Sequence, residues 1–358
     1  MSEETQIVTE AQTARLALLN QFRKEFGPQS MFLLGQDEKL SNIEVRSSGS
    51  LLLDLALGGG YPKGRIIEFS GPEGAGKTTL FDLAVAEAQI VEPEKENAII
   101  DLEQSFSPPW ARTLGVDIDR LFIAQPDTYA EKIFDLLESM IKSNRFAYIG
   151  LDSVAGLVLK SEFEEQDWEK ESRVGGASKV LAKAMRKLVN SGILTKSGTT
   201  LIFINQLRDK IGGFSMYGTP TDTTGGRSIK HAYSQRIEVG RGEYKKKGTD
   251  VIGQQTKLKV AKNKIAAPHK TANLDLYYED GVDRLTELVL VAKEINVLAG
   301  GGWLTFQNPL TGEIFEQYGK EGRFNGAPKT REALVEDIEA GGTLYAHMME
   351  VVQTVIRS

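Results

Sequence analysis

The chain has 358 residues, 41% of them hydrophobic, so it can bury a full core and is expected to form one large domain with smaller appendages. Its net charge of −6 argues against a uniformly basic nucleic-acid binder, and the lack of cysteine excludes disulfides and thiolate metal sites. No apolar run approaches the roughly 18 residues of a membrane span, and the polar first residues do not resemble a signal peptide, which favours a cytoplasmic protein without a membrane partner.

A leading helix is predicted over residues 11–26, before the helix-breaking pair Gly27-Pro28. Its apolar residues recur at helical spacing: Leu16, Leu19, Phe22 and Phe26. This stripe could pack on its own domain or on a neighbouring copy, and packing on its own domain is the favoured interpretation.

From about residue 40 to 270, apolar strand-like runs alternate with helical stretches. The clearest strands are expected over 65–70, 97–103, 145–154 and 199–206, and a helix over 78–89. Such alternation is typical of a parallel sheet covered by helices. The rest of the chain, which ends in one predicted helix over 331–357, suggests a small α+β domain. We therefore expect an α/β fold divided into an N-terminal helical segment (1–40), a core (41–275) and a C-terminal domain (276–358).

The stretch "GPEGAGKTTL" fits the phosphate-binding P-loop and lies between an expected strand and an expected helix. Glycines let backbone N–H groups turn toward an anion, Lys77 can reach the terminal phosphates, and the Thr78 hydroxyl can ligate Mg²⁺. A glycine-rich turn that matches by chance is the alternative. The nucleotide-binding residues expected here are Gly71, Pro72, Glu73, Gly74, Ala75, Gly76, Lys77, Thr78 and Thr79.

Polar side chains end three of the other expected strands. Glu103 could polarise the water that attacks a γ-phosphate, and Asp152 could support Mg²⁺. Asn205 and Gln206 carry neutral amides that can bind a phosphate through hydrogen bonds. The alternative interpretation of each acid is a solvated strand end.

Two long, polar, glycine-containing stretches, 162–179 and 207–228, each follow a strand end. Connections of this length inside a compact domain are usually functional or disordered. In an open parallel sheet, the loops that leave the carboxyl ends of the strands face the ligand.

Several strings resemble the bacterial RecA recombinases, in a version similar to a phage-encoded or divergent member. They are "SSGSLLLDLALGGGYPKGRIIEFSGPEGAGKTTL", "LGVDIDRLFIAQPD", "LDSVAGL", "KAMRKL", "TLIFINQLRDKIGGF", "TTGG" and "VAKNKIAAPHK". The resemblance extends from about residue 15 to beyond residue 300. It implies a RecA-type P-loop ATPase core that uses ATP and Mg²⁺, binds single-stranded and double-stranded DNA without sequence preference, and assembles with itself into a helical filament. Residues 1–40 would then be the polymerisation segment.

The resemblance also implies roles for individual residues. Lys77 and Thr78 would bind phosphates and Mg²⁺, Glu103 would activate water, Asp152 would support the metal and Gln206 would sense the γ-phosphate. Lys262 and Lys264 would reach the ATP of a neighbouring subunit. Trp110 stands at the adenine-stacking position, and Tyr278 is also assigned to the nucleotide site.

By the same resemblance, the two long stretches become DNA-binding loops, in which cations and backbone amides contact phosphates rather than bases. The first contributes residues in or just after the loop: Arg173, Lys179 and Arg186. The second contributes Arg208, Lys210, Ile211, Thr223, Thr224, Gly225, Gly226 and Arg227. Arg241, Lys257 and Lys259 match a secondary strand-binding surface.

Three positions depart from the family pattern. Ser107 replaces an aspartate that touches the adenine edge in relatives, which bears on base selectivity. Asp209 replaces a methionine in the second loop, and His231 stands where relatives often insert a phenylalanine into the next subunit.

These features together predict an ATP-dependent homologous recombination protein that forms filaments on single-stranded DNA and catalyses homology search and strand exchange. A ring helicase of the same fold and a structural DNA-coating protein gated by nucleotide are the alternatives. "KNKIAAP" argues against the ring helicase, and Glu103 beside Lys77 argues for turnover rather than passive coating.

Overall fold

The computed structural model describes residues 3–27, 31–33, 43–165, 176–209, 221–223 and 229–358. The chain divides into two units, Met1–Glu44 and Val45–Ser358. The first unit contains α1 (Glu3–Phe26), which begins earlier than the predicted helix and ends at the predicted residue. Leu19 is buried on this helix, whereas Leu16 and Phe26 are exposed. The predicted packing of the apolar stripe, like the three domain boundaries, stays a prediction.

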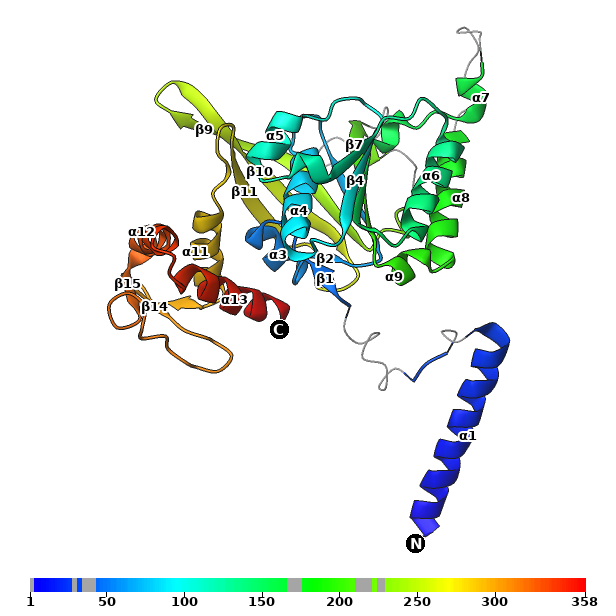
Figure 1. Cartoon of the computed structure of the whole chain (residues 1–358), viewed down its shortest axis with the longest axis horizontal. Helices are drawn as coiled ribbons and strands as arrows, with labels where there is room; N and C mark the ends of the chain where they lie inside the picture. The colour runs from blue at the N-terminus through cyan, green and yellow to red at the C-terminus, as the bar shows by residue number, and fades with distance from the viewer. Residues whose placement is uncertain (1–2, 28–30, 34–42, 166–175, 210–220, 224–228) are drawn as a thin grey trace. The chain divides into compact units, whose positions relative to one another are not determined.

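A large sheet organises the second unit (Figure 1). Its strands run in the order β12 (Gly281–Val282), β11 (Thr271–Tyr277), β10 (Asp250–Asn263), β9 (Gln235–Lys247), β3 (Ile66–Gly71), β7 (Thr200–Asp209), β6 (Phe146–Asp152), β4 (Glu96–Asp101) and β5 (Leu121–Ala124). Neighbours are parallel from β9 to β5 and antiparallel from β9 to β12. The mostly parallel sheet predicted from the alternating pattern is confirmed.

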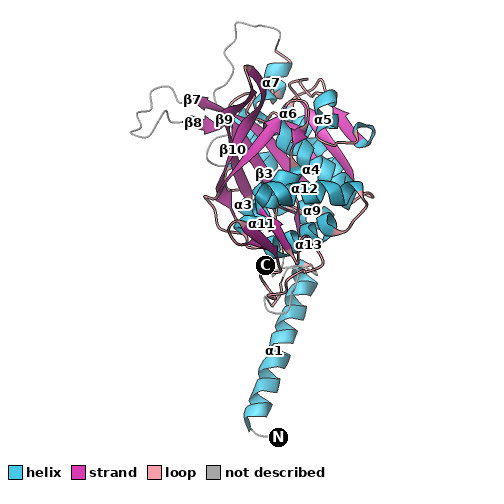
Figure 2. Cartoon of the chain, turned by 90° about the vertical axis from the view of Figure 1, so that its left-hand side faces the viewer, coloured by secondary structure: helices cyan, strands magenta, loops and turns pink. Residues whose placement is uncertain are grey.

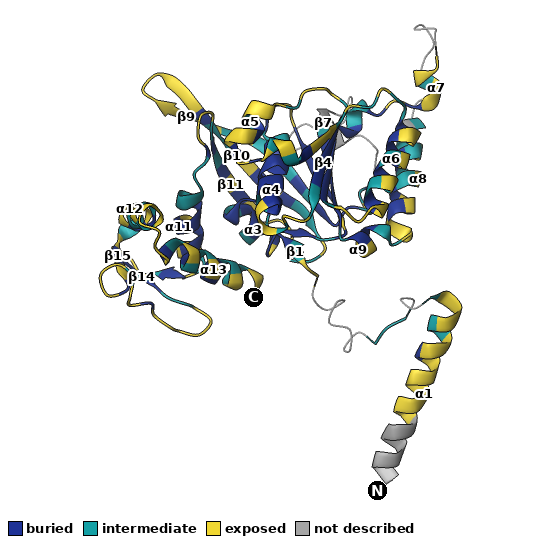
Figure 3. Cartoon of the chain, in the orientation of Figure 1, coloured by how far each residue is buried: buried dark blue, intermediate teal, exposed yellow. Residues whose placement is uncertain are grey.

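Different helices bury the two faces of this sheet. Consecutive residues of one strand point to opposite faces, so Ile202 and Ile204 join one apolar cluster while Leu201 and Phe203 join the other. The first cluster packs under α3 (Leu51–Leu57), α4 (Lys77–Val91) and α5 (Pro108–Thr113). The second packs under α6 (Ala130–Lys142), α8 (Gly176–Asn190) and α9 (Ile193–Ser197). Burial on both faces explains the nearly continuous apolar strands (Figure 3).

Short elements complete the second unit around the sheet. They are β1 (Val45–Arg46), which pairs with β2 (Tyr61–Pro62), the 3-10 turns η2 (Ile118–Arg120) and η3 (Val154–Gly156), and α7 (Lys160–Phe163). In the described part of the chain, no helix is long and apolar enough to span a membrane.

The second long stretch was predicted to begin as a loop at residue 207, after a strand ending at residue 206. β7 continues to Asp209 and pairs antiparallel with β8 (Thr221–Thr223), side by side with it in Figure 2. Pairing satisfies the backbone groups that an irregular loop would leave to solvent, and threonine suits a strand. The stretch therefore has a two-stranded stem.

The C-terminal part combines helices with a small antiparallel sheet. The sheet contains β13 (Leu298–Ala299), β14 (Trp303–Phe306) and β15 (Arg323–Asn325). It packs with α11 (Arg284–Glu294), α12 (Gly326–Glu339) and α13 (Leu344–Arg357) around a cluster that includes Phe306 and Leu334. The single helix predicted over 331–357 is wrong. Gly341, with φ of 66°, adopts a left-handed conformation that ends α12, and a second helix follows.

Two buried carboxyls lie where α3 meets α11. Glu287 accepts a hydrogen bond of 2.5 Å from the Ser50 hydroxyl, and Asp54 accepts one of 2.6 Å from the Ser47 hydroxyl. Burial raises the pKa of Glu287 to about 7, against the opposing effect of the Ser50 bond. Burial likewise raises the pKa of Asp54 to about 6.

This junction should make stability depend on pH. Because the pKa of Glu287 in the folded chain exceeds its ordinary value of 4.5, its contribution to stability is full below that value and is lost as pH rises through about 7. Glu287→Gln cannot ionise and should not lose this stability. We therefore expect the unfolding free energy of Glu287→Gln, relative to that of the wild type, to increase by about 1–3 kcal/mol from about pH 5 to about pH 8. Urea denaturation at both pH values measures this difference. Glu313→Gln, at an exposed position, is the control, and an unchanged pH slope in Glu287→Gln would contradict the assignment.

Candidate nucleotide site and nucleic-acid interface

The P-loop connects β3 to α4 at the carboxyl edge of the sheet. Gly76 precedes the first turn of α4 with φ of 95°, a left-handed conformation that favours glycine. No side chain caps this helix end, and the first turn contains no acidic residue. The N–H groups at the start of α4 and the positive end of its dipole are therefore available to an anion.

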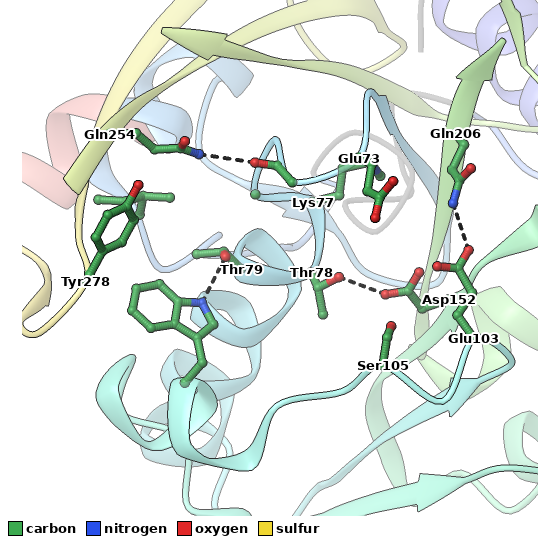
Figure 4. Close-up of a pocket in the computed structure, with 14 residues that line it drawn as sticks. Glu73, Lys77, Thr78, Thr79, Glu103, Ser105, Asp152, Gln206, Gln254 and Tyr278 are labelled. Carbon is green, nitrogen blue, oxygen red and sulfur yellow. Dashed lines mark hydrogen bonds between the residues drawn. The ribbon is translucent and has the colours of Figure 1, made fainter. Parts of the chain in front are cut away.

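A cavity of about 400 Å³ opens beside the P-loop (Figure 4). It brings together side chains from the ends of several strands and from the start of α4. The lining residues are Glu73, Gly74, Gly76, Lys77, Thr78, Thr79, Glu103, Ser105, Trp110, Asp152, Gln206, Gln254, Leu276 and Tyr278. The cavity thus gathers most of the residues predicted for nucleotide, metal and catalysis, although they lie far apart in the sequence.

Lys77 lies across the mouth of the P-loop. Its ammonium group donates hydrogen bonds to the carbonyls of Gly71 (3.1 Å) and Pro72 (2.7 Å). Burial lowers its pKa from the usual value, while the charges of Asp152 and Glu103 oppose that change. Both hydrogen-bond partners of this largely buried ammonium group are neutral carbonyls, so a phosphate would give it an anionic partner.

Thr78 and Asp152 form the pair predicted for a metal. The Thr78 hydroxyl donates to Asp152 Oδ2 at 2.7 Å, and burial raises the pKa of Asp152 to about 6. A hydroxyl and a carboxylate are hard oxygen ligands, the kind that Mg²⁺ prefers. The donor chemistry therefore fits the predicted ion.

Glu103 lies between two hydrogen-bond donors. Gln206 Nε2 donates to Glu103 Oε1 at 2.9 Å, and the Ser153 hydroxyl donates to the same oxygen. Both of these hydrogen bonds end on Oε1 of Glu103. In the described part of the chain no hydrogen bond to Oε2 is formed, so this oxygen can accept one from a water. The predicted base and the predicted phosphate sensor are thus in direct contact.

The opposite end of the cavity is aromatic. The Trp110 indole N–H donates to Thr79 Oγ1 at 3.0 Å, which fixes the ring against the first turn of α4. Tyr278 also lines the cavity and is 48% exposed. Ser107 precedes α5 and does not line the cavity.

Sequence reasoning missed several residues of this site. Ser105, Gln254 and Leu276 line the cavity without belonging to a recognisable motif. Asp101 was also missed: it is buried at the end of β4 and accepts bonds from the backbone N–H groups of Ser105 and Phe106, so it shapes the turn that carries Glu103. Its place in "IIDLEQ", one residue before Leu102 and two before Glu103, was the available signal.

Lys262 and Lys264 do not line this cavity. Lys262 Nζ donates to the Lys230 carbonyl at 2.6 Å, and Lys264 Nζ donates to the His231 carbonyl at 2.9 Å. Burial, followed by the charge of Lys264, lowers the pKa of Lys262. The structure of one chain thus does not bring these lysines to its own phosphate site.

The predicted DNA-binding residues fall in three groups. Lys179 and Arg186 belong to a helix, α8, rather than to a loop, and both are exposed. The backbone of Arg208 and of Thr223 belongs to the β7–β8 stem, in which Arg208 pairs with Asp222. The others lie outside the described residues: Arg173, Lys210, Ile211, Thr224, Gly225, Gly226 and Arg227.

Comparison with known proteins identifies the family. A model described as the RecA N-terminal domain matches residues 13–283. "Protein RecA" of Listeria monocytogenes serotype 4a is 42% identical over 319 residues, covering 88% of this chain and 89% of the relative. "Protein RecA" of Mycoplasma mycoides subsp. mycoides SC is 45% identical over 298 residues, covering 82% and 83%. Both organisms are bacteria, so these relatives give no support to a phage origin. The chain belongs to the RecA family of bacterial recombinases.

Proposed function

We propose that this recombinase hydrolyses ATP with Mg²⁺ in the cavity beside the P-loop and forms a helical filament on single-stranded DNA. The filament searches duplex DNA for homology and exchanges strands in the bacterial cytoplasm. The observation that supports this most is the meeting of Lys77, the Thr78–Asp152 pair and the Glu103–Gln206 pair in one cavity. Phosphate binding, metal support and water activation are the three parts of phosphoryl transfer to water.

In the proposed hydrolysis, Glu103 Oε2 accepts a proton from a water whose oxygen bonds to the γ-phosphorus, and the bond from that phosphorus to the ADP oxygen breaks. Lys77 stabilises the charge on the phosphate oxygens. Thr78 and Asp152 would hold Mg²⁺, which would neutralise part of the same charge when bound. Without nucleotide, the 2.9 Å hydrogen bond from Gln206 holds Glu103 in place. In this proposal Gln206 breaks that bond when its amide binds the γ-phosphate.

The active site is proposed to be shared between neighbouring subunits. Lys262 and Lys264 donate to backbone carbonyls of their own chain and lie outside its cavity. Lys264 is exposed, so it is accessible to a second copy. A cation supplied in trans would make hydrolysis depend on assembly.

The DNA interface is proposed to be continuous with the phosphate sensor. Gln206 and the first strand of the β7–β8 stem both belong to β7, so a movement of Gln206 toward a γ-phosphate would be passed directly to the second loop. The exposed cations Lys179 and Arg186 add phosphate contacts on α8. Base pairing between strands, rather than the protein, would read the sequence.

Phosphate release and electron microscopy test the proposal together. We expect single-stranded DNA to stimulate phosphate release from MgATP and helical filaments to form on that DNA. Lys77→Ala should abolish nucleotide-dependent DNA binding, because the phosphate charge loses its main side-chain partner. Lys132→Ala, which removes an exposed lysine of α6, is the control.

The alternative functions predict other outcomes. Closed rings that unwind duplex DNA would support a ring helicase, and filaments without phosphate release would support a nucleotide-gated coating protein. Unchanged ATP affinity in Lys77→Ala would contradict the P-loop assignment.

A further inference from the structure

The hairpin of β9 and β10 contacts the P-loop through side chains of both strands. The far end of this hairpin extends beyond the rest of the sheet (Figure 1). Three hairpin side chains donate to three successive P-loop carbonyls. Arg241 donates to the Glu73 carbonyl, Gln254 to the Gly74 carbonyl at 3.2 Å and Thr256 to the Ala75 carbonyl at 3.4 Å. We call Arg241, Gln254 and Thr256 the hairpin clamp.

The local structure of the hairpin brings these three side chains to one surface. Arg241 and Thr256 are partners in the β9–β10 register, and the pairing shifts between Gln254 and Thr256. Side chains two residues apart on a strand point to the same face, which accounts for Gln254 and Thr256 of β10 contacting adjacent peptides of the P-loop. Gln255, between them, bonds instead to Asp275 Oδ1 at 3.2 Å.

The clamp matters because each peptide group is planar, with its C=O and its N–H on opposite sides. When the carbonyls of Glu73, Gly74 and Ala75 are held toward the hairpin, the N–H groups of the following residues turn toward the cavity. Inward N–H groups of a glycine-rich loop are the groups that bind phosphate. Figure 4 shows the Gln254 amide directed at the P-loop from the side away from Asp152.

Close packing leaves the P-loop little freedom beneath the clamp. Gly74 has φ of 64°, and a Cβ atom there would lie 3.1 Å from Arg241 Nη2. A Cβ at Gly71 would lie 2.1 Å from the carbonyl oxygen of Val239 in β9. The hairpin therefore contacts the loop along most of its length, from its first glycine to Ala75.

We propose that the hairpin clamp positions the P-loop: Arg241, Gln254 and Thr256 hold its peptides in the orientation that binds nucleotide phosphates. This rests on the proposed ATP site. Without the clamp, the loop must be ordered by the nucleotide itself, and the cost of that ordering lowers affinity. Arg241 and Thr256 do not line the cavity and are positioning residues, because they act through the P-loop backbone. Gln254 also lines the cavity, and its positioning role is its bond to the Gly74 carbonyl.

The test measures MgADP binding to the full chain by calorimetry without DNA, so that effects on a secondary DNA surface do not register. We expect Arg241→Ala to weaken binding about 10-fold and Gln254→Ala about 3-fold, the scale of a charged and a neutral hydrogen bond. The matched controls should bind within about 2-fold of the wild type. They are Lys246→Ala, which removes an exposed cation of β9, and Gln255→Ala, which removes the neighbouring glutamine.

Two further readouts separate positioning from a general structural role. Arg241→Lys, which keeps a charged donor, should recover part of the lost affinity. In ATP turnover, Arg241→Ala should raise KM by a larger factor than it lowers kcat, since saturating nucleotide can order the loop.

The remaining outcomes overturn the inference in distinct ways. Wild-type affinity in both Arg241→Ala and Gln254→Ala would show that the clamp does not position the loop. Equal losses in the clamp variants and their controls would assign the effect to hairpin folding instead. A wild-type chain that binds no MgADP would refute the proposed ATP site itself.

Discussion

Glu103→Gln should bind ATP and single-stranded DNA but release phosphate at least roughly 10²-fold more slowly, as expected when a general base is lost. Glutamine has the shape of glutamate and can still accept the bonds from Gln206 and Ser153, so the site should keep its geometry. It cannot take a proton from water. The loss should therefore appear in kcat rather than in nucleotide affinity.

Two further variants make this measurement specific. Glu96→Gln changes a glutamate at the other end of β4, away from the cavity, and should leave turnover unchanged. Ser153→Ala removes one hydrogen bond to Glu103 but keeps the carboxylate, so it should slow turnover less than Glu103→Gln does. Near-normal turnover in Glu103→Gln would place the base elsewhere, and loss of ATP binding would make Glu103 a structural residue.

The core of the fold was predictable because burial on both faces of a parallel sheet leaves a plain signal. Runs such as "RIIEFS" and "TLIFIN" are mostly apolar, and β3 and β7 include nearly all of their residues. The carboxyl ends of such strands meet at one edge, so Glu103, Asp152 and Gln206 could be expected near the P-loop. The cavity contains all three.

Other features depend on contacts that one sequence does not reveal. Arg241 and Gln254 lie on β9 and β10, far from the P-loop in the sequence, and only the folded sheet brings them to its carbonyls. β7 extends to Asp209 because β8 provides a partner.

The break between α12 and α13, in contrast, was predictable from Gly341, whose conformational freedom the helical pattern around it obscured.

The shared active site predicts rescue between two inactive variants. Lys264→Ala and Glu103→Gln should each be nearly inactive in DNA-stimulated ATP hydrolysis while still binding single-stranded DNA. Mixed together, they should recover activity. A junction works when the subunit that holds ATP keeps Glu103 and its neighbour keeps Lys264, so one-to-one mixing should make about a quarter of the junctions competent, by the logic of a cation supplied in trans.

Co-assembly must be established before the mixture is interpreted, because Lys264 also bonds to the His231 carbonyl of its own chain. A tagged Glu103→Gln chain should pull down untagged Lys264→Ala chain on DNA. Lys270→Ala, which removes an exposed lysine from the turn before β11, is the matched control and should be active alone. Residues that act in one chain would give no rescue, since every subunit would still lack one of the two groups. With co-assembly demonstrated, a mixture no more active than its components would refute both the shared site and the role of Lys264 in a neighbouring subunit's hydrolysis.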